Sequence, residues 1–226
     1  MAKKKVTRKE LLNEPDEFIT FSAKLLKIMA TYKVQLLYAV GLLILVGIIF
    51  SGISYFSFRS EGQAFALLDK TMKNYEVSLK KNGPEKAFKE VKNDFVKIID
   101  KYSGNRGGKI ARIELANISA NAGDTDSAID LYRKALEDFS DNQTVKNIIL
   151  NNLGYAFEEK NDLQSALNYF AMILSEPDTF LKDEALFNLG RIYAAMGNEK
   201  MSRDAYNKIV SDFPGSFYLA IAKERS

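Results

Sequence analysis

The chain has 226 residues, with 32 Lys and Arg against 29 Asp and Glu, and it contains no Cys, His or Trp. Without Cys it can form neither a disulfide framework nor a thiolate metal site. Without His it has no Ser-His-Asp triad, no HExxH zinc site and no imidazole base that titrates near neutral pH. The composition therefore disfavours an enzyme, and it predicts no catalytic residue, cofactor, metal ion or small-molecule substrate.

Residues 1–33 form a basic tail with eight basic and four acidic side chains. A helix is predicted to begin at Pro15-Asp16-Glu17, because proline and acidic residues favour the first helical turn. Lys24 and Lys27 can reach lipid headgroups from this helix. The pattern fits a helix at the cytoplasmic membrane surface, and it fits equally a helix that docks on a partner protein. The apolar residues at helical spacing on one face are Phe18, Phe21, Leu25, Met29 and Tyr32.

Residues 34–58 contain no charged side chain. About 20 apolar residues at ~1.5 Å each cross a hydrocarbon layer of ~30 Å, so this run is long enough to span a membrane. The alternatives are a buried core helix and a cleaved signal peptide, but no Ala-x-Ala site follows and an unusually long tail precedes the run. The sequence predicts an uncleaved single-pass anchor. Gly47 and Ser51 lie four residues apart, a spacing that lets two membrane helices pack closely as a homodimer.

The distribution of charge predicts the orientation of this anchor. The tail carries a net charge of +4, whereas the residues after it carry 24 basic and 25 acidic side chains. Only Arg59 follows the apolar run closely, and the next basic residue is Lys70. The positive-inside rule then places the tail in the cytoplasm and residues 59–226 outside it. The nearly neutral C-terminal part also gives no reason to expect nucleic acid as a partner.

Residues 59–226 are predicted to be all-α. Apolar residues recur at i, i+3, i+4 and i+7, and the interruptions are short, which is typical of antiparallel helical hairpins. One interruption, Gly104–Gly108, resembles a P-loop but has too few residues before Gly108-Lys109 and Ile110 in place of Ser or Thr, so it is interpreted as a turn. The interruptions are Asn82-Gly83-Pro84, Gly104–Gly108, Gly123-Asp124, Asn161-Asp162, Gly197-Asn198 and Pro214-Gly215.

The helices repeat a pattern of small, apolar and aromatic residues. Its spacing is that of the tetratricopeptide repeat, W-x2-L-G-x2-Y followed by A-x3-F and P. It recurs 36 residues upstream of the last unit, and again a further 38 residues upstream. A degenerate pair is expected at residues 63–79 and 84–102, and a capping helix at 216–225. The last full unit consists of Leu186, Leu189-Gly190, Tyr193, Ser202, Tyr206, Ile209 and Pro214.

Packing explains why the repeat needs these residue types. A small residue after the leucine, such as Gly154 or Gly190, lets the two helices of one repeat approach closely. The aromatic residues are expected to fill the gap to the next repeat; they are Tyr132, Phe157, Phe170, Tyr193 and Tyr206. The sequence therefore predicts a transmembrane helix followed by a superhelix of about three to four hairpins.

The basic tail, the single anchor and the phased repeats together resemble the YfgM-like group, the ancillary subunit of the SecYEG translocon. The repeat domain of that group is similar to that of cell-division coordinator proteins. The resemblance covers the layout from about Lys33 to the end of the chain. It implies a bacterial inner-membrane protein whose repeat domain faces the periplasm. Its implied partners are translocon subunits, periplasmic chaperones or proteins of an envelope complex.

The resemblance also implies a protein-binding groove lined by the first helix of each repeat. Asparagine side chains can pair with the backbone of an extended peptide, and aromatic rings add buried area. The alternative is that these are ordinary polar helix positions. The acidic pair Glu158-Glu159 disfavours a ligand with a C-terminal carboxylate. The inward positions are Ile113, Asn117, Asn121, Asn151, Asn152, Tyr155, Glu158, Glu159, Phe187, Asn188 and Arg191.

The leading functional hypothesis is a membrane-anchored, non-enzymatic scaffold at the translocon that passes exported chains to periplasmic chaperones. The alternative is a structural role in organising a cell-envelope or cell-division complex. A third interpretation turns the repeat domain into the cytoplasm as a docking receptor. Residues 1–33, 34–58 and 59–226 are the predicted tail, anchor and repeat domain.

Overall fold

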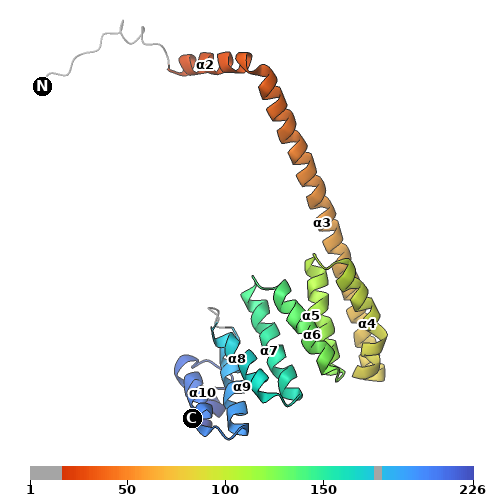
Figure 1. Ribbon diagram of the computed structural model, residues 1–226, viewed down its shortest axis with the longest axis vertical. Coiled ribbons are helices and arrows are strands. Elements are labelled where there is room, and N and C mark those ends of the chain that lie inside the picture. Colours follow the sequence, from red (N-terminus) through yellow and green to blue (C-terminus); the bar gives the residue numbers. More distant parts are fainter. Residues whose placement is uncertain (1–16, 176–179) are drawn as a thin grey trace, which may run out of the picture. The chain divides into compact units, whose positions relative to one another are not determined.

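A computed structural model describes residues 17–175 and 180–226 of the chain, and all the regular secondary structure within these ranges is helical (Figure 1). The all-α prediction is thereby confirmed. The chain divides into two compact units, Met1–Ser57 and Phe58–Ser226. The predicted helix start at Pro15-Asp16 lies outside the described residues, and the helix is described from Glu17 onward.

The first unit contains α2 (Glu17–Thr31) and the beginning of α3 (Lys33–Asn82). Among the described residues, α3 is the one helix long and apolar enough to cross a membrane, and no residue of its apolar window is buried within the chain. The helix does not end with the apolar run, because residues 59–62 contain no proline and helix propagation is cooperative. The predicted repeat helix at 63–79 is therefore the C-terminal part of α3.

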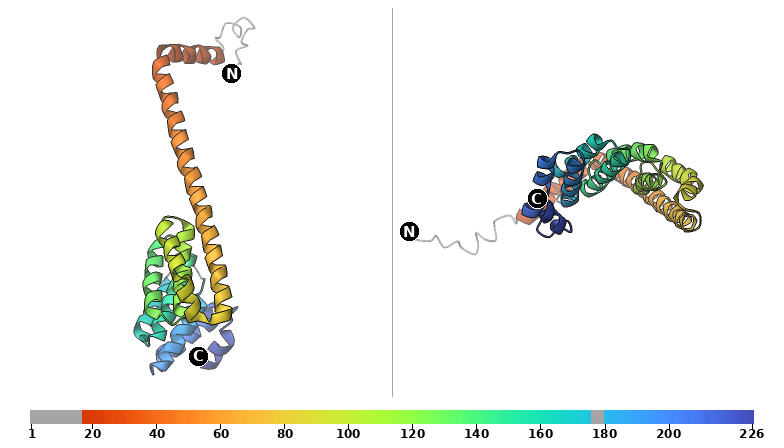
Figure 2. Two further views of the ribbon diagram at one scale, coloured as in Figure 1. Left: turned by 90° about the vertical axis from the view of Figure 1, so that its right-hand side faces the viewer. Right: turned by 90° about the horizontal axis from the view of Figure 1, so that it is seen from below.

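The second unit continues with helices that each contact the next one in sequence. Figure 2 shows these helices following one another in an arc. They form the predicted hairpins, of which α5–α6, α7–α8 and α9–α10 are the three repeats recognised by their residue pattern. The bounds are α4 (Pro84–Lys101), α5 (Arg106–Asn121), α6 (Thr125–Asp138), α7 (Gln143–Glu159), α8 (Leu163–Ser175), α9 (Lys182–Ala195), α10 (Glu199–Asp212) and α11 (Leu219–Arg225).

The turn inside each repeat has the same construction. A residue with positive φ ends the first helix: Gly123 at 80°, Asn161 at 61° and Gly197 at 76°. Glycine and asparagine tolerate this left-handed conformation, which other residues rarely adopt. The next residue is Asp or Asn, whose side chain accepts a hydrogen bond from a backbone N–H in the first turn of the second helix. The predicted turns at these three places are confirmed.

Two glycines set the distance between the helices of a repeat. A Cβ on Gly154 would lie 2.5 Å from Cζ of Phe170, and a Cβ on Gly190 would lie 2.8 Å from Cζ of Tyr206. Both rings are almost completely buried. The prediction of close approach at these glycines is confirmed. Phe170 and Tyr206 each pack on the glycine of their own repeat, and Tyr206 also belongs to the apolar cluster that contains Ala222 of α11.

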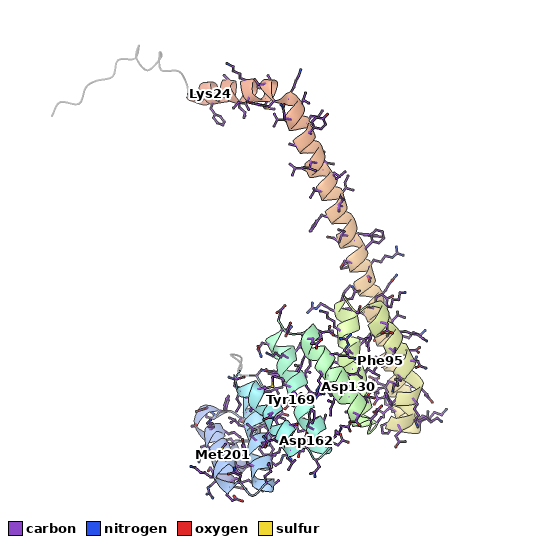
Figure 3. The ribbon with its side chains drawn as sticks, viewed as in Figure 1. Lys24, Phe95, Asp130, Asp162, Tyr169 and Met201 are labelled. Atoms are coloured by element: carbon purple, nitrogen blue, oxygen red, sulfur yellow. The ribbon has the colours of Figure 1, made fainter. Side chains whose placement is uncertain are left out.

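The apolar core of the second unit consists of three clusters, and the partly buried Leu131 and Leu174 each pack against two of them. The first cluster joins α3, α4 and α5, and its member Phe95 is fully buried (Figure 3). The second cluster joins α5 to α10, and the third packs Ala222 of α11 against Tyr206 and Ile209. The predicted terminal capping helix is thus present. It begins at Leu219, three residues later than predicted, because Ser216 instead donates to the Asp183 carboxylate (2.6 Å).

The predicted turn at Gly104–Gly108 is wrong in its second half, where α5 already begins at Arg106. A Cβ on Gly107 would lie 2.7 Å from Cβ of Ala64, and one on Gly108 would lie 2.0 Å from the carbonyl oxygen of Tyr102. Gly107 therefore allows the close approach of α5 to α3, and Gly108 allows its close approach to the turn that follows α4, which outweighs the low helix propensity of glycine.

Glu61 of α3 caps the start of α5. Its carboxylate accepts hydrogen bonds from the backbone N–H groups of Arg106 and Gly107 and from the Asn105 amide, each at 3.1 Å. The first N–H groups of a helix have no partner within the helix, and the helix dipole favours negative charge there. A side chain from one hairpin thus satisfies the helix start of the next.

Replacing Glu61 by alanine is expected to lower the free energy of unfolding by about 1–2 kcal/mol, because the start of α5 loses its cap. Urea unfolding of the full chain in detergent, followed by circular dichroism, measures the change. Glu90→Ala is the matched control, since Glu90 is exposed on α4; it should shift stability by no more than about 0.5 kcal/mol. Equal effects of the two substitutions would contradict the capping role.

Candidate functional site

An open depression of about 490 Å³ lies between α5 and α7. Both helices are the first of their repeats, and they contact each other directly. Among its lining residues Ala156 and Tyr132 of α6 are buried, and Asn121, Tyr155 and Glu159 are exposed. The lining residues are Asn117, Ala120, Asn121, Tyr132, Asn152, Tyr155, Ala156 and Glu159.

Asn117 organises the α5 side of this depression. Its Oδ1 accepts hydrogen bonds from the Tyr132 hydroxyl (2.6 Å) and from Nδ2 of Asn152 (3.2 Å), so it ties α6 and α7 to α5. Burial raises the pKa of Tyr132 well above its usual value, which keeps the hydroxyl protonated as a donor. The position of the Asn152 amide at the depression is therefore fixed by the neighbouring repeat.

Tyr155 organises the opposite side. Its hydroxyl donates to Oε1 of Glu184 (2.8 Å) and accepts from Nδ2 of Asn188 (2.9 Å), which links α7 to α9. Its ring packs edge-on against Phe170, with 5.4 Å between the ring centroids. The ring is 40% exposed and forms part of the depression. Nδ2 of Asn151 donates to the same Glu184 oxygen (3.0 Å).

The next link between α7 and α9 is ionic. Arg191 donates to both carboxylate oxygens of Glu158, with 2.7 Å between Nη2 and Oε2, and Nη2 also donates to Asn188 (3.2 Å). The hydrogen bond with Glu158 raises the pKa of Arg191. A two-pronged guanidinium–carboxylate pair is geometrically specific. It fixes how the two repeats are rotated relative to each other.

Removing the Tyr155 hydroxyl should change the alkaline stability. Burial raises the pKa of Tyr155 to about 12, against about 10 in an unfolded chain. The protonated form is favoured in the folded state, so its contribution is complete below pH 10 and is lost as the pH rises toward 12. Tyr155→Phe should therefore lose stability less steeply between about pH 10 and 12. Urea midpoints measured at several pH values test this, and an unchanged slope would contradict it.

The structure brings five of the predicted groove residues together around the depression and places the others elsewhere. Ile113 lies in the core, and Asn151 and Asn188 are buried between helices, where their amides bond to the next or the previous repeat. Glu158 and Arg191 pair with each other. Phe187 stacks on Tyr218, with ring centroids 4.4 Å apart. The five at the depression are Asn117, Asn121, Asn152, Tyr155 and Glu159.

Sequence reasoning missed two residues that shape this surface. The repeat pattern treats Tyr132 as a packing aromatic, although its hydroxyl reaches the depression. Glu184 does not belong to the predicted groove, yet it accepts from both Tyr155 and Asn151. Glu184 could have been found from its position, 33 residues after Asn151. This separation is close to one repeat length, at which side chains of adjacent first helices meet.

No group of three or more Asp, Glu, His or Cys side chains that could hold a metal ion occurs within the described residues. The depression itself offers one carboxylate, from Glu159, together with amides and hydroxyls. This arrangement can exchange hydrogen bonds with a polar backbone, and it contains no paired acid and base of the kind that proton-transfer catalysis needs.

Antiparallel helical hairpins stacked in sequence, with a small-residue and aromatic pair inside each, define a tetratricopeptide-repeat-like array. The chain belongs to the family of the tetratricopeptide repeat-like domain, whose family model matches residues 32–217. This fold is typically a non-catalytic scaffold for protein–protein interactions, and such domains commonly bind proteins. No curated protein matches the chain by sequence.

Several solved structures share the fold. BtubC (BKLC) from P. vanneervenii has a TM-score of 0.57 and 15% identity, over 77% of this chain and 75% of that chain. A tetratricopeptide repeat protein from Parabacteroides merdae has a TM-score of 0.55 and 19% identity, over 71% of this chain and 59% of that chain. The nearly identical repeats of a Podosopora anserina putative kinesin light chain have a TM-score of 0.53 and 11% identity, over 70% of this chain and 86% of that chain.

Proposed function

We propose that this protein is a membrane-anchored scaffold that binds another protein at the depression between α5 and α7. The observation that carries the proposal is the depression itself, an open polar surface held in a fixed shape by contacts from three repeats. Groups that bind a partner are most effective when their positions are fixed before binding, because less ordering entropy is then lost. The family supports protein binding as the general activity.

The exposed groups of the depression fit an extended polypeptide segment. Within the described residues, the side chains of Asn121 and Glu159 make no hydrogen bond or ion pair, and both are exposed. An amide offers two donors and an acceptor, which match the N–H and C=O groups of an extended backbone without demanding a sequence. The exposed edge of Tyr155 adds an aromatic contact of the kind enriched where binding energy is concentrated.

The apolar part of α3 supplies the anchor in this proposal. Residues 34–58 span the membrane, residues 1–33 lie in the cytoplasm, and residues 59–226 lie on the extracytoplasmic side. The net charge of +4 on the tail supports this orientation. The resemblance to the ancillary translocon subunit supports the inner membrane of a bacterium, and a role in passing exported chains to periplasmic chaperones.

Labelling of single cysteines tests the anchor and its orientation. The chain has no Cys, so one introduced thiol reports on one position. In intact bacterial cells a membrane-impermeant maleimide should label Asn168→Cys on α8, and it should label Lys24→Cys only after the membrane is opened. The reverse pattern would place the repeat domain in the cytoplasm as a docking receptor. Labelling of both positions in intact cells would contradict a cytoplasmic tail.

Crosslinking at native expression separates the translocon role from the structural alternative. If the chain is an accessory factor of the translocon, translocon subunits and exported chains should be recovered with it. Blocking export should then reduce the yield of exported chains. If the chain organises an envelope or division complex, proteins of that complex should be recovered and the yield should not depend on export. Recovery of an envelope or division complex would contradict the translocon role but would still agree with a protein-binding scaffold.

A further inference from the structure

The helix α2 has two chemically different faces. Its apolar side chains Phe21, Leu25, Leu26, Ile28 and Met29 are between 47% and 66% exposed, so no part of the described chain covers them. At ~100° per residue these five positions extend over about 160° of the helix circumference. By the same rotation Lys27 lies opposite the centre of this face, and Lys24 lies just beyond its edge, about 40° from Ile28. A helix this apolar on one side requires a partner for that side.

The junction between α2 and α3 changes the direction of the chain. α2 ends at Thr31 and α3 begins at Lys33, with Tyr32 between them. Figures 1 and 2 show α2 lying across the direction in which α3 starts, and both segments belong to the first unit. The Thr31 hydroxyl donates to the carbonyl oxygen of Lys27 (2.8 Å), a bond that competes with the helical pattern and bends helices. The bend separates α2 from the apolar run.

We propose that α2 lies in the plane of the membrane surface on the tail side, with its apolar face among the lipid acyl chains and Lys24 and Lys27 at the lipid phosphates. This rests on the proposed function, in which α3 spans the membrane. A helix attached directly to the end of a span, and directed across it, lies at the depth where hydrocarbon meets headgroups. Amphipathic helices bind there with the apolar face about 5–10 Å into the boundary.

The breadth of the apolar face favours lipid over a partner protein. A helix that docks in a protein groove typically presents a stripe of anchors at i, i+3, i+4 and i+7. On α2 the apolar face also includes Leu26, which lies well to the side of the stripe formed by Phe21, Leu25 and Ile28. A fluid layer of acyl chains accepts such a broad face without shape complementarity. The two lysines can extend their side chains from the polar face to anionic headgroups.

Fluorescence quenching on the full chain tests this placement. Single-cysteine variants Leu25→Cys, Ile28→Cys, Lys24→Cys and Lys27→Cys carry the polarity-sensitive dye NBD in vesicles of phosphatidylethanolamine and phosphatidylglycerol. Doxyl-labelled lipids quench from the hydrocarbon, and iodide on both sides quenches from water. The dye at Leu25 and Ile28 should be quenched by doxyl lipids and several-fold less by iodide than the dye at Lys24 and Lys27.

Two results would overturn the inference. Equal iodide quenching at all four positions would mean that α2 stands free in water, as a docking helix without its partner would. Protection of Leu25 and Ile28 from both quenchers would mean that a second copy of the chain covers them. Val46→Cys in the apolar run is the reference for the span. If doxyl lipids quench the dye at position 46 but not at position 25, the surface position of α2 is contradicted and the membrane anchor is supported. If they do not quench the dye at position 46, the membrane anchor is contradicted as well.

Discussion

Replacing Phe170 by alanine is expected to lower the free energy of unfolding by about 3–5 kcal/mol. The ring is completely buried, lies against Gly154 of its own repeat and contacts Tyr155 edge-on. Its removal leaves a cavity between α7 and α8 that a glycine on the facing helix cannot fill. Urea unfolding of the full chain in detergent, followed by circular dichroism, measures the loss.

Phe217→Ala provides the matched control for this substitution. The Phe217 side chain is 92% exposed, so the same chemical change removes almost no buried surface. Its effect should stay within about 0.5 kcal/mol. If Phe217→Ala were as costly as Phe170→Ala, the assignment of the repeat core would be contradicted.

Gly154→Ala is expected to destabilise the protein by about 1–3 kcal/mol, although alanine is the better helix former. The added methyl group would lie 2.5 Å from the Phe170 ring, so the ring or the helix must shift. Gly62→Ala makes the same change in α3, where a Cβ meets nothing within 4 Å. It should stabilise the chain by roughly 0.5–1 kcal/mol.

The two substitutions are expected to change the free energy of unfolding in opposite directions, and urea unfolding measures both changes. A stabilising Gly154→Ala would mean that α7 and α8 do not need the close approach that the glycine allows. Combining Gly154→Ala with Phe170→Leu should cost less than the sum of the two single changes, because the smaller side chain makes room for the methyl group.

The repeats could be predicted because their core is local in the sequence. Gly154 lies on the first helix of a hairpin and Phe170, 16 residues later, lies on the second, so the close approach at Gly154 depends on local spacing alone. The predicted close approach is confirmed, whereas the contact of this glycine with the Phe170 ring was not predicted. The turns at Gly123, Asn161 and Gly197 are also local, since a single residue type provides the conformation that each turn needs. The continuity of α3 from the apolar run into the first repeat helix was not predicted. Arg59 ends the apolar run, but no residue at 59–62 ends the helix.

The site was harder to predict because it depends on how neighbouring repeats are rotated. Asn151 and Asn152 are adjacent in the sequence, yet Asn151 is buried against Glu184 while Asn152 reaches the depression. A difference of about 100° around α7 separates these outcomes. The rotation is fixed by bonds between residues 33 to 35 positions apart, such as Arg191 with Glu158 and Asn152 with Asn117. Spacing patterns within one repeat do not contain this information.

These bonds give the polar residues of the first helices a structural role as well as a proposed binding role. Asn188 is almost completely buried, and it bonds to Tyr155 and Arg191. A buried amide that lost these partners would destabilise the interface between two repeats. Changes at Asn121 and Glu159, which line the depression without holding repeats together, are therefore the better tests of binding.

Site-specific photo-crosslinking tests the proposed binding surface most directly. The photoreactive residue p-benzoylphenylalanine replaces Asn121 at the depression or, as a control of the same residue type, the exposed Asn168 on α8. Irradiation of cells at native expression should give discrete crosslinked protein species from position 121, several-fold above position 168, and Glu159→Arg should reduce them. Equal yields from the two positions, or species that Glu159→Arg leaves unchanged, would contradict protein binding at the depression.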